Sequence, residues 1–422
     1  MRPTEIPKGF KTFLPEEAEK RERILKIMEE VLSLWGYRLL SPPTIEYLST
    51  FKIVDENLEE FSFKLVDRFT GKLMAIRPDF TPQVAKIVAS SFKDDDPPFR
   101  FFYKGKIFRD AGKDREIFQF GFEVIGVSEV EADAEVVSVV VNILEKLGLS
   151  SFQIDIGNSE FLEGALEELK IPDREEFLKL LSHKDLSGIE IFLEERKISK
   201  DTRIKIEKLL ELYGREEVLD SAYQLFENSK SRAALKRLKE MFAILKSYGF
   251  EKKVIFDLSE KRGMEYHKGI TFEVFHPLYG FSLGSGGRYD GLMKKFGRNL
   301  PATGVALNVD ALQELLEKKG LLKVEDSGDF YIIDLEKELH RAYELAKALR
   351  KLGYKVARDI VKRDLKSSLE IAFKKGFKNV IVLNRENDEH KCTLFLSNKK
   401  TYQYAYVPKA EEIVKAAALE KI

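Results

Sequence analysis

Cysteine, clustered histidine and long apolar runs are almost absent from this chain of 422 residues. Cys392 is the single cysteine, which excludes a disulfide framework and a cysteine-based zinc site. No two histidines form an H-x-x-x-H pair that could hold a metal ion. We therefore expect neither a structural or catalytic metal nor any other cofactor. The scattered histidines are His183, His267, His276, His340 and His390.

Net charge and membrane signals are missing as well. Lys+Arg and Asp+Glu are equal at 71 each, so the formal net charge is zero, whereas nucleic-acid binding favours a basic surface. The sequence contains no apolar run long enough to span a membrane, and residues 1–7 lack the apolar core of a signal peptide. We expect a cytoplasmic protein without a membrane or nucleic-acid partner.

Apolar residues are plentiful, at 44% hydrophobic, and their spacing predicts a chain of mixed helices and strands. Ile24, Met28 and Val31 recur at helical spacing within residues 16–35, and Gly36 follows as a C-terminal cap. Residues 61–67 and 72–76 are two strand-like runs joined around Thr70-Gly71, and this arrangement predicts a hairpin. The expected strands are 37–40, 61–67, 72–76, 99–103, 106–109, 115–126, 151–156, 253–258, 269–275 and 281–284, and a second helix covers 129–147.

The strand at 115–126 has the clearest alternation. One face is a layer of four large apolar side chains, while the other carries an amide and a carboxylate that flank a glycine. A solvent-exposed strand also alternates, but it rarely needs such an apolar layer behind it. We predict that the polar face is a pocket wall. The apolar set is Phe118, Phe120, Phe122 and Val124; the opposite set is Ile117, Gln119, Gly121, Glu123 and Ile125.

Three regions differ in composition. Residues 1–325 form the main region, and within them residues 158–250 have long amphipathic, charged helices and predict a helical insertion. Residues 328–410 alternate strand, helix, strand, helix and strand, which predicts a small, mostly parallel sheet flanked by helices.

Two segments near the end of the main region resemble motif 3 of histidyl-tRNA synthetases. They are Ser285-Gly-Gly-Arg-Tyr-Asp-Gly-Leu292 and the run from Pro301 to Leu312. The family has a Gly-Leu-Glu-Arg-Leu-type run where this chain has Asn-Val-Asp-Ala-Leu, so Ala311 stands in the place of an arginine. A guanidinium pairs two phosphate oxygens in a planar fork, and a methyl group pairs none.

Further segments extend the resemblance over nearly the whole chain. Leu40-Ser-Pro-Pro-Thr-Ile-Glu-Tyr47 is similar to motif 1 of class II synthetases, which lies at a dimer interface. Residues 108–123 resemble motif 2, and residues 328–410 resemble the anticodon-binding domain. Arg77-Pro-Asp-Phe-Thr-Pro-Gln83 and Arg262-Gly-Met-Glu-Tyr-His267 resemble two histidine-specific segments. The resemblance implies an α+β fold: a class II synthetase-like antiparallel sheet with helices and a helical insertion, plus a C-terminal α/β domain.

The resemblance also implies a site for histidine, which presents an ammonium, a carboxylate and an imidazole. Carboxylates suit the ammonium and a ring N–H, neutral groups supply further hydrogen bonds, and an arginine suits the ligand carboxylate. The expected histidine-binding residues are Asp79, Thr81, Gln119, Glu123, Arg262, Tyr266, His267 and Tyr289, and Arg109 and Arg115 remain from an ATP site.

The ATP half of the motifs is eroded at more than one place. Ala111 stands where the family has a glutamate that holds adenine, and the loop to Arg115 is shorter than the family's. Together with Ala311, these losses make the chain resemble the regulatory subunits of ATP phosphoribosyltransferase. That family implies no catalytic residues, a short-form catalytic chain as partner, histidine as feedback effector, and a homodimer through motif 1 inside a hetero-oligomer.

Two alternatives stay open. Arg262 matches an arginine that assists adenylate formation, so an active histidyl-tRNA synthetase with a divergent ATP site remains the second interpretation. The third is a synthetase-like binding module associated with RNA or a kinase. Neither a kinase-like region nor a long basic extension is present to favour it.

Overall fold

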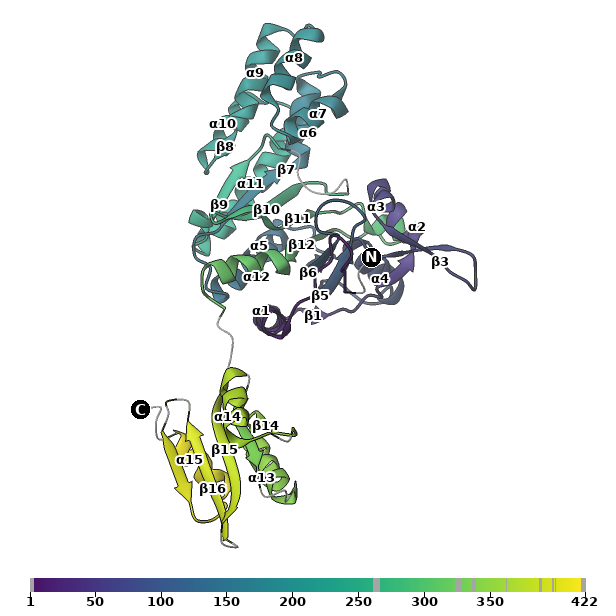
Figure 1. Ribbon diagram of the computed structural model, residues 1–422. Coiled ribbons are helices and arrows are strands. Elements are labelled where there is room, and N and C mark those ends of the chain that lie inside the picture. Colours follow the sequence, from purple (N-terminus) through teal and green to yellow (C-terminus); the bar gives the residue numbers. More distant parts are fainter. Residues whose placement is uncertain are drawn as a thin grey trace. The chain divides into compact units, whose positions relative to one another are not determined.

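The computed structural model describes residues 4–260, 266–322, 328–335, 339–361, 363–386, 389–396, 398 and 400–418. The chain divides into two compact units, Met1–Leu322 and Lys323–Ile422 (Figure 1). Within the described ranges, none of the helices combines the length and the apolar character needed to cross a membrane.

A nine-stranded sheet forms the centre of the first unit, in the order β1-β5-β6-β12-β11-β10-β7-β9-β8. Neighbouring strands are antiparallel except for the parallel pairs β1–β5 and β7–β9. The segments that resemble motifs 2 and 3 therefore become adjacent strands, although they are far apart in the sequence. The strands are β1 (Arg38–Leu39), β5 (Phe99–Phe108), β6 (Glu116–Ile125), β7 (Gln153–Asn158), β8 (Tyr213–Gly214), β9 (Val254–Asp257), β10 (Ile270–His276), β11 (Tyr279–Arg288) and β12 (Ala302–Asn308).

Strand β5 corrects one prediction. The two strands expected at 99–103 and 106–109 are one strand, which pairs with β6 along its whole length. Gly105 interrupts the apolar pattern but not the strand. A Cβ at this position would lie 2.6 Å from Nη2 of Arg77, so the glycine leaves room for the buried guanidinium.

One face of the sheet is covered by α1 (Pro15–Leu34), α5 (Val130–Lys146) and α12 (Val309–Lys318). Phe120, Phe122 and Val124 are buried in this layer, so the predicted apolar face of β6 is confirmed. The carboxylate and amide of the same strand consequently point to the opposite face.

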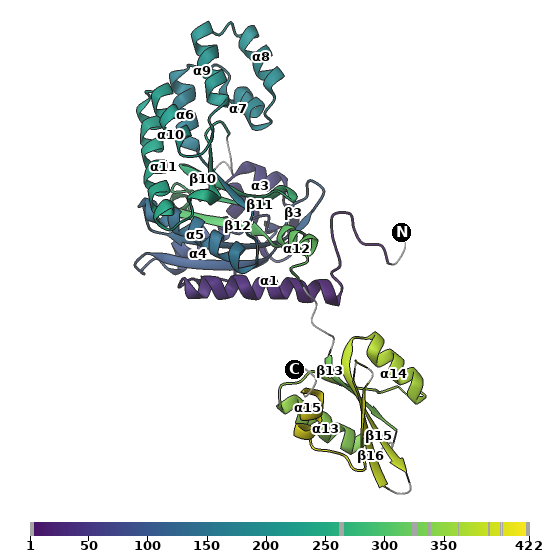
Figure 2. The same cartoon turned by 90° about the vertical axis from the view of Figure 1, so that its left-hand side faces the viewer.

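The segment between β7 and β9 is mainly helical, and the buried apolar residues of its helices belong to the same hydrophobic core as those of the nine-stranded sheet. Helix α11 packs on α5, α6 and β7, and β8 pairs with β9 at the edge of the sheet. Figures 1 and 2 both show α1 at one end of this unit and α7, α8 and α9 at the other. The helices are α6 (Ser159–Glu168), α7 (Arg174–Ser182), α8 (Leu186–Glu195), α9 (Lys200–Leu210), α10 (Glu217–Leu225) and α11 (Ser229–Ser247).

A second, three-stranded sheet has the antiparallel order β2-β4-β3. It contains the predicted hairpin, which is confirmed. Helix α2 lies close to this sheet and to α4, and α4 begins two residues after Asp79. The elements are β2 (Ile45–Tyr47), α2 (Leu48–Lys52), α3 (Glu56–Glu60), β3 (Phe63–Val66), β4 (Leu73–Ile76) and α4 (Thr81–Ser91).

The C-terminal unit has a five-stranded sheet in the order β14-β13-β15-β16-β17. Only β14, β13 and β15 are parallel, because β16 and β17 add two antiparallel strands that the sequence interpretation missed. The prediction of a mostly parallel sheet was therefore wrong for this half. The elements are β13 (Gly328–Asp334), α13 (Leu339–Lys351), β14 (Val356–Arg358), α14 (Leu365–Lys374), β15 (Phe377–Glu386), β16 (Glu389–Leu396), β17 (Thr401–Tyr404) and α15 (Ala410–Ala418).

Candidate functional site

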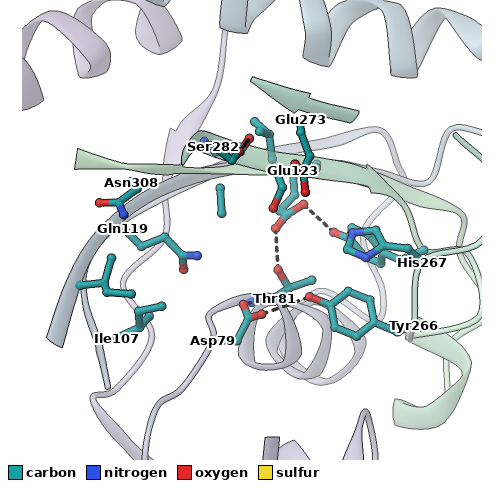
Figure 3. A pocket seen from close by; sticks show the side chains of 18 of the residues that line it. Asp79, Thr81, Ile107, Gln119, Glu123, Tyr266, His267, Glu273, Ser282 and Asn308 are labelled. Carbon is teal, nitrogen blue, oxygen red and sulfur yellow. Dashed lines mark hydrogen bonds between the residues drawn. The ribbon is translucent and has the colours of Figure 1, made fainter. Parts of the chain in front are cut away.

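A cavity of about 430 Å³ lies on the polar face of β6 (Figure 3). Its size is in the range of small-molecule pockets. The walls come from β5, β6, β10, β11 and β12, from the start of α4, and from the turn before β10. The lining residues are Asp79, Thr81, Ile107, Arg109, Ile117, Gln119, Glu123, Tyr266, His267, Glu273, Ser282, Gly284, Ser285, Gly286, Tyr289, Gly304, Val305, Ala306 and Asn308.

The structure brings most of the predicted site residues together around this cavity. Arg262 lies outside the described residues. Arg115 is placed elsewhere: its guanidinium packs on the rings of Phe10 and Phe63 and pairs with Asp110. The predicted residues that line the cavity are Asp79, Thr81, Arg109, Gln119, Glu123, Tyr266, His267 and Tyr289.

Glu123 is the most deeply enclosed acid of the cavity, with an exposed fraction of 1%. Its Oε1 accepts hydrogen bonds from the hydroxyls of Thr81 at 3.2 Å and Tyr103 at 3.1 Å. Its Oε2 accepts from the hydroxyl of Tyr289 at 2.7 Å. Three neutral donors thus hold the carboxylate in one orientation.

Asp79 forms a second acidic centre at the start of α4. Its Oδ1 accepts from the backbone N–H of Thr81 at 3.0 Å, and its Oδ2 accepts from the hydroxyl of Tyr266 at 3.1 Å. The Tyr266 ring also stands edge-on to the ring of Tyr289, with centroids 6.1 Å apart. The two acidic centres therefore share one aromatic wall, formed by Tyr266 and Tyr289.

Two glycines make room for this arrangement. A Cβ at Gly304 would lie 1.4 Å from Oε2 of Glu123, and one at Gly121 would lie 2.3 Å from the hydroxyl oxygen of Tyr103. Both distances are far below van der Waals contact. The absence of side chains at these strand positions is therefore a requirement of the site.

The electrostatic environment of Glu123 is unusual. Burial raises its pKa to about 8; Asp79 acts in the same direction, and the three hydroxyl donors oppose the shift. Within the described residues, the groups that donate to Glu123 and Asp79 are neutral hydroxyls and one backbone N–H. A positively charged ligand would offset the free-energy cost of burying these carboxyl groups in their charged form.

Sequence reasoning missed several residues around the cavity. Glu273, on β10, adds a third carboxyl group to the lining, where Arg109 is the cation among the described residues. Tyr103, on β5, was missed as a donor to Glu123. A signal for Tyr103 existed, because a glycine in the middle of the neighbouring strand indicates a large side chain opposite it. The lining also includes Ser282 and Asn308, which were not predicted.

Among the described residues, the lining of the cavity has little cationic character. Arg109 lines it, but its Nε donates to the carbonyl of Pro78 at 3.1 Å. Asn308 occupies the position of the family's glycine, and its side chain caps α12 by accepting from the N–H of Ala311 at 3.1 Å. Ala111 is exposed in the loop between β5 and β6.

Ala311 lies outside this cavity, in a small hollow of about 60 Å³ next to it. Its exposed fraction is 2%. Arg21 of α1 enters the same hollow, pairs with Asp310 and stacks on the ring of Phe13, with 3.6 Å from the guanidinium carbon to the ring centroid. A ligand-binding arginine at position 311 would have to displace these groups.

Within the described residues, no group of three or more His, Cys, Asp or Glu side chains is arranged to hold a metal ion. The chemistry that the arrangement supports is recognition of a small molecule with a cationic group and hydrogen-bonding polar atoms.

Comparison with known proteins places the chain in a family. A family model described as histidyl-tRNA synthetase matches residues 9–312. A relative from Syntrophotalea carbinolica, named ATP phosphoribosyltransferase regulatory subunit, is 39% identical over 385 residues, which cover 90% of each chain. A relative of the same name from Geobacter metallireducens is 37% identical and is matched over 90% of this chain and 89% of its own length.

Solved structures agree with this assignment. A protein from Bacillus halodurans, described as an ATP phosphoribosyltransferase regulatory subunit/histidyl-tRNA synthetase, matches with a TM-score of 0.82 and 30% identity over 90% of this chain and 98% of its own. A histidyl-tRNA synthetase from Nostoc has a TM-score of 0.81 at 22% identity, over 98% and 99% of the two chains, which concerns the fold alone. The chain has the class II histidyl-tRNA synthetase fold and belongs to the family of ATP phosphoribosyltransferase regulatory subunits.

Proposed function

We propose that this chain is a non-catalytic regulatory subunit that acts in the first step of histidine biosynthesis and binds histidine in the cavity on β6. Its partner is a short-form catalytic chain of ATP phosphoribosyltransferase, whose activity it supports and makes sensitive to histidine. The names of its relatives support the regulatory role. The observation that carries the histidine site is the pair of buried, hydroxyl-bonded carboxyl groups, Asp79 and Glu123.

The cavity matches histidine group by group. The carboxyl groups of Asp79 and Glu123 suit an ammonium or an imidazole N–H of the ligand, because their oxygens accept hydrogen bonds. Gln119 has a buried Oε1 without a hydrogen-bond partner among the described residues, and its side chain reaches into the cavity in Figure 3. An unpaired buried acceptor favours a ligand that donates to it. Arg262, the expected partner of the ligand carboxylate, lies outside the described residues, and Arg109 is the arginine that lines the described part of the cavity.

Several features support the absence of adenylation. Phosphate binding and transfer depend on preorganised cations. At the two positions where the family has an arginine and a glutamate for ATP, this chain has Ala311 and Ala111. Arg21 and Phe13 fill the space next to Ala311, so the loss involves repacking as well as deletion of one side chain.

An apolar sheet face supports the homodimer within the complex. Alternation places two rows of apolar residues on one face of the β2-β4-β3 sheet, each row crossing all three strands. Every member of these rows is at least partly exposed, while Ala75 on the opposite face is buried. An exposed apolar sheet face of this kind marks an interface, and β2 belongs to the segment that resembles motif 1. The rows are Ile45, Ile76 and Phe63, and then Tyr47, Met74 and Leu65.

The test combines the purified chain with a short-form catalytic subunit. Phosphoribosyl transfer is measured for the catalytic chain alone, with this chain, and with this chain plus increasing histidine. We expect activation by the chain and inhibition by histidine through a coupling of about 1–3 kcal/mol. Glu123→Gln in this chain should keep the activation and lose the inhibition. If histidine leaves the transfer rate of the complex unchanged, the proposal loses its central claim.

An active histidyl-tRNA synthetase is the second candidate, because Arg109 still lines the cavity. Histidine-dependent ATP–pyrophosphate exchange by the purified chain distinguishes the two. Exchange that disappears in Arg109→Ala would establish the synthetase. Its absence, together with histidine binding, supports the regulatory role.

A further inference from the structure

Asp133, on α5, is a buried carboxylate that holds two arginines from different parts of the fold. Its exposed fraction is 1%. Its Oδ1 accepts from Nε of Arg288 at 3.1 Å and its Oδ2 accepts from Nη2 of Arg288 at 3.0 Å, so this pair is bidentate. The same Oδ2 accepts from Nη2 of Arg237 at 2.9 Å. Asp133 thus joins the end of β11 to α11 of the helical insertion.

Arg288 fixes the end of β11 from both directions. Its Nη1 donates to the carbonyl of Val127 at 3.0 Å and to Oδ1 of Asp290 at 3.2 Å. The same Asp290 oxygen accepts from the N–H of Ala302 on β12 at 3.0 Å. The residue between Arg288 and Asp290 is Tyr289, the donor to Glu123 in the cavity. Tyr289 therefore lies between two residues, Arg288 and Asp290, that are bonded to each other and to neighbouring segments. These bonds fix the backbone from which the Tyr289 ring projects.

Arg237 connects this clamp to the insertion. A second bond runs from its Nη2 to the carbonyl of Ser128 at 2.7 Å, in the loop before α5. The arginine is partly exposed, with 29% of its side chain accessible, whereas Arg288 and Asp133 are almost fully buried. A solvent-accessible cation shares its acceptor atom with a buried one. Removing the Arg237 side chain therefore redistributes hydrogen bonds, but Asp133 keeps its pair with Arg288.

We propose that Asp133 is a positioning residue for the histidine pocket and that Arg237 couples the helical insertion to it. The sequence of contacts is Arg237 to Asp133, Asp133 to Arg288, and Tyr289 to Glu123. A displacement of α11 moves Arg237 and changes the hydrogen bonds between Asp133 and Arg288. The position of the Tyr289 hydroxyl changes as a result. By reciprocity, histidine in the pocket stabilises the present position of α11. This inference rests on the proposed histidine site.

The experiment measures the histidine dissociation constant of the whole chain by calorimetry. Arg237→Ala is compared with the wild type, with Arg237→Lys and with Lys236→Ala, a change of the exposed neighbour on α11. We expect Arg237→Ala to weaken histidine about 2- to 30-fold, the range of mutations that modulate coupling between sites. Arg237→Lys should recover part of the loss, and Lys236→Ala should bind like the wild type.

A double-mutant cycle separates positioning from general loosening of the fold. Tyr289→Phe removes the hydroxyl through which the effect should reach Glu123. In that background Arg237→Ala should cost little further affinity, because the two changes act along one path. Equal losses from Arg237→Ala with and without the Tyr289 hydroxyl would overturn the inference.

The outcomes also separate this inference from the proposed function. A wild-type chain that binds no histidine defeats both. A wild-type chain that binds histidine, together with Arg237 variants that bind it equally well, leaves the proposed site standing and overturns the coupling alone.

Discussion

Tyr289 and Glu123 are joined by a hydrogen bond of 2.7 Å that crosses a strand. Tyr289 follows β11, Glu123 belongs to β6, and β12 lies between those two strands in the sheet. Gly304 of β12 is the residue paired with Glu123, and it has no side chain to block the bond. The pocket thus depends on one missing side chain as much as on the polar groups around it.

Gly304→Ala is expected to destroy the pocket. The added methyl group would lie 1.4 Å from Oε2 of Glu123, so the buried carboxylate must leave its donors. Histidine binding should be lost, with a lower melting temperature. Gly291→Ala is the matched control, because its added Cβ has nothing within 4 Å. Calorimetric binding by Gly304→Ala at wild-type affinity would contradict the geometry.

Tyr289→Phe tests the individual hydrogen bond. Leaving a buried polar group without its hydrogen-bond partner costs about 1–3 kcal/mol. We expect histidine binding to weaken by a similar free energy, while the ring still packs against Tyr266. Titration calorimetry of this variant beside Tyr279→Phe, a tyrosine at the start of β11 that does not line the cavity, provides the check. Equal histidine affinities in the two variants would show that the Tyr289 hydroxyl contributes nothing to histidine binding.

The pH dependence of folding should report Glu123. The folded pKa is about 8, well above the value of about 4.3 for an unfolded glutamate. The folded state therefore keeps a proton that the unfolded state has released. Without ligand, this group's contribution to stability falls as pH rises from about 4.5 to 8 and then levels off. Urea unfolding across this range should show a shallower fall in Glu123→Gln than in the wild type.

Histidine binding should release a proton at pH 7. A cationic group beside Glu123 favours the carboxylate and lowers the pKa that burial has raised. Calorimetry in buffers of different ionisation enthalpy measures the released proton directly. Glu123→Gln has no such proton to release. A binding enthalpy that is independent of the buffer in the wild-type chain would argue against Glu123 as the acceptor of the cationic group.

Restoring the missing arginine should not restore adenylation. Ala311 is buried beside the Arg21–Asp310 pair, so Ala311→Arg forces two guanidinium groups together and should destabilise the chain by roughly 1–3 kcal/mol. Pyrophosphate exchange should stay at background even with Ala111→Glu added. Lys318→Arg, on an exposed part of α12 outside this hollow, is the control for stability. Robust exchange in the double variant would refute this expectation.

Leu65→Asp should weaken self-association. Leu65 belongs to the apolar face of the β2-β4-β3 sheet, and a charge there opposes burial against a second copy. Analytical ultracentrifugation should show a shift toward the monomer. Lys64→Asp introduces the same side chain on the opposite face of the strand and should leave the association state unchanged. Identical behaviour of the two variants would exclude this face as the interface.

The local pattern of the sequence was sufficient for many elements of the fold. Strict alternation between 115 and 126 predicted both the strand and its two faces, because the period of side chains in a strand is two residues. The break expected near Gly105 and the missed β16 and β17 have a different origin. Gly105 leaves room for the guanidinium of Arg77, which is distant in the sequence, and β16 is a strand because it pairs with β15. A local window of sequence shows neither relationship.

The sequence by itself determined which chemical groups were available: two acids, several hydroxyls and an alanine in place of an arginine. Only the tertiary structure decided their relations. It brought Asp79, Glu123 and Tyr289 around one cavity, placed Arg115 elsewhere, and buried Ala311 beneath Arg21. The physical reason is that periodicity fixes the face on which a residue lies. Which strands become neighbours, and which side chains a glycine admits, follow from long-range pairing and packing.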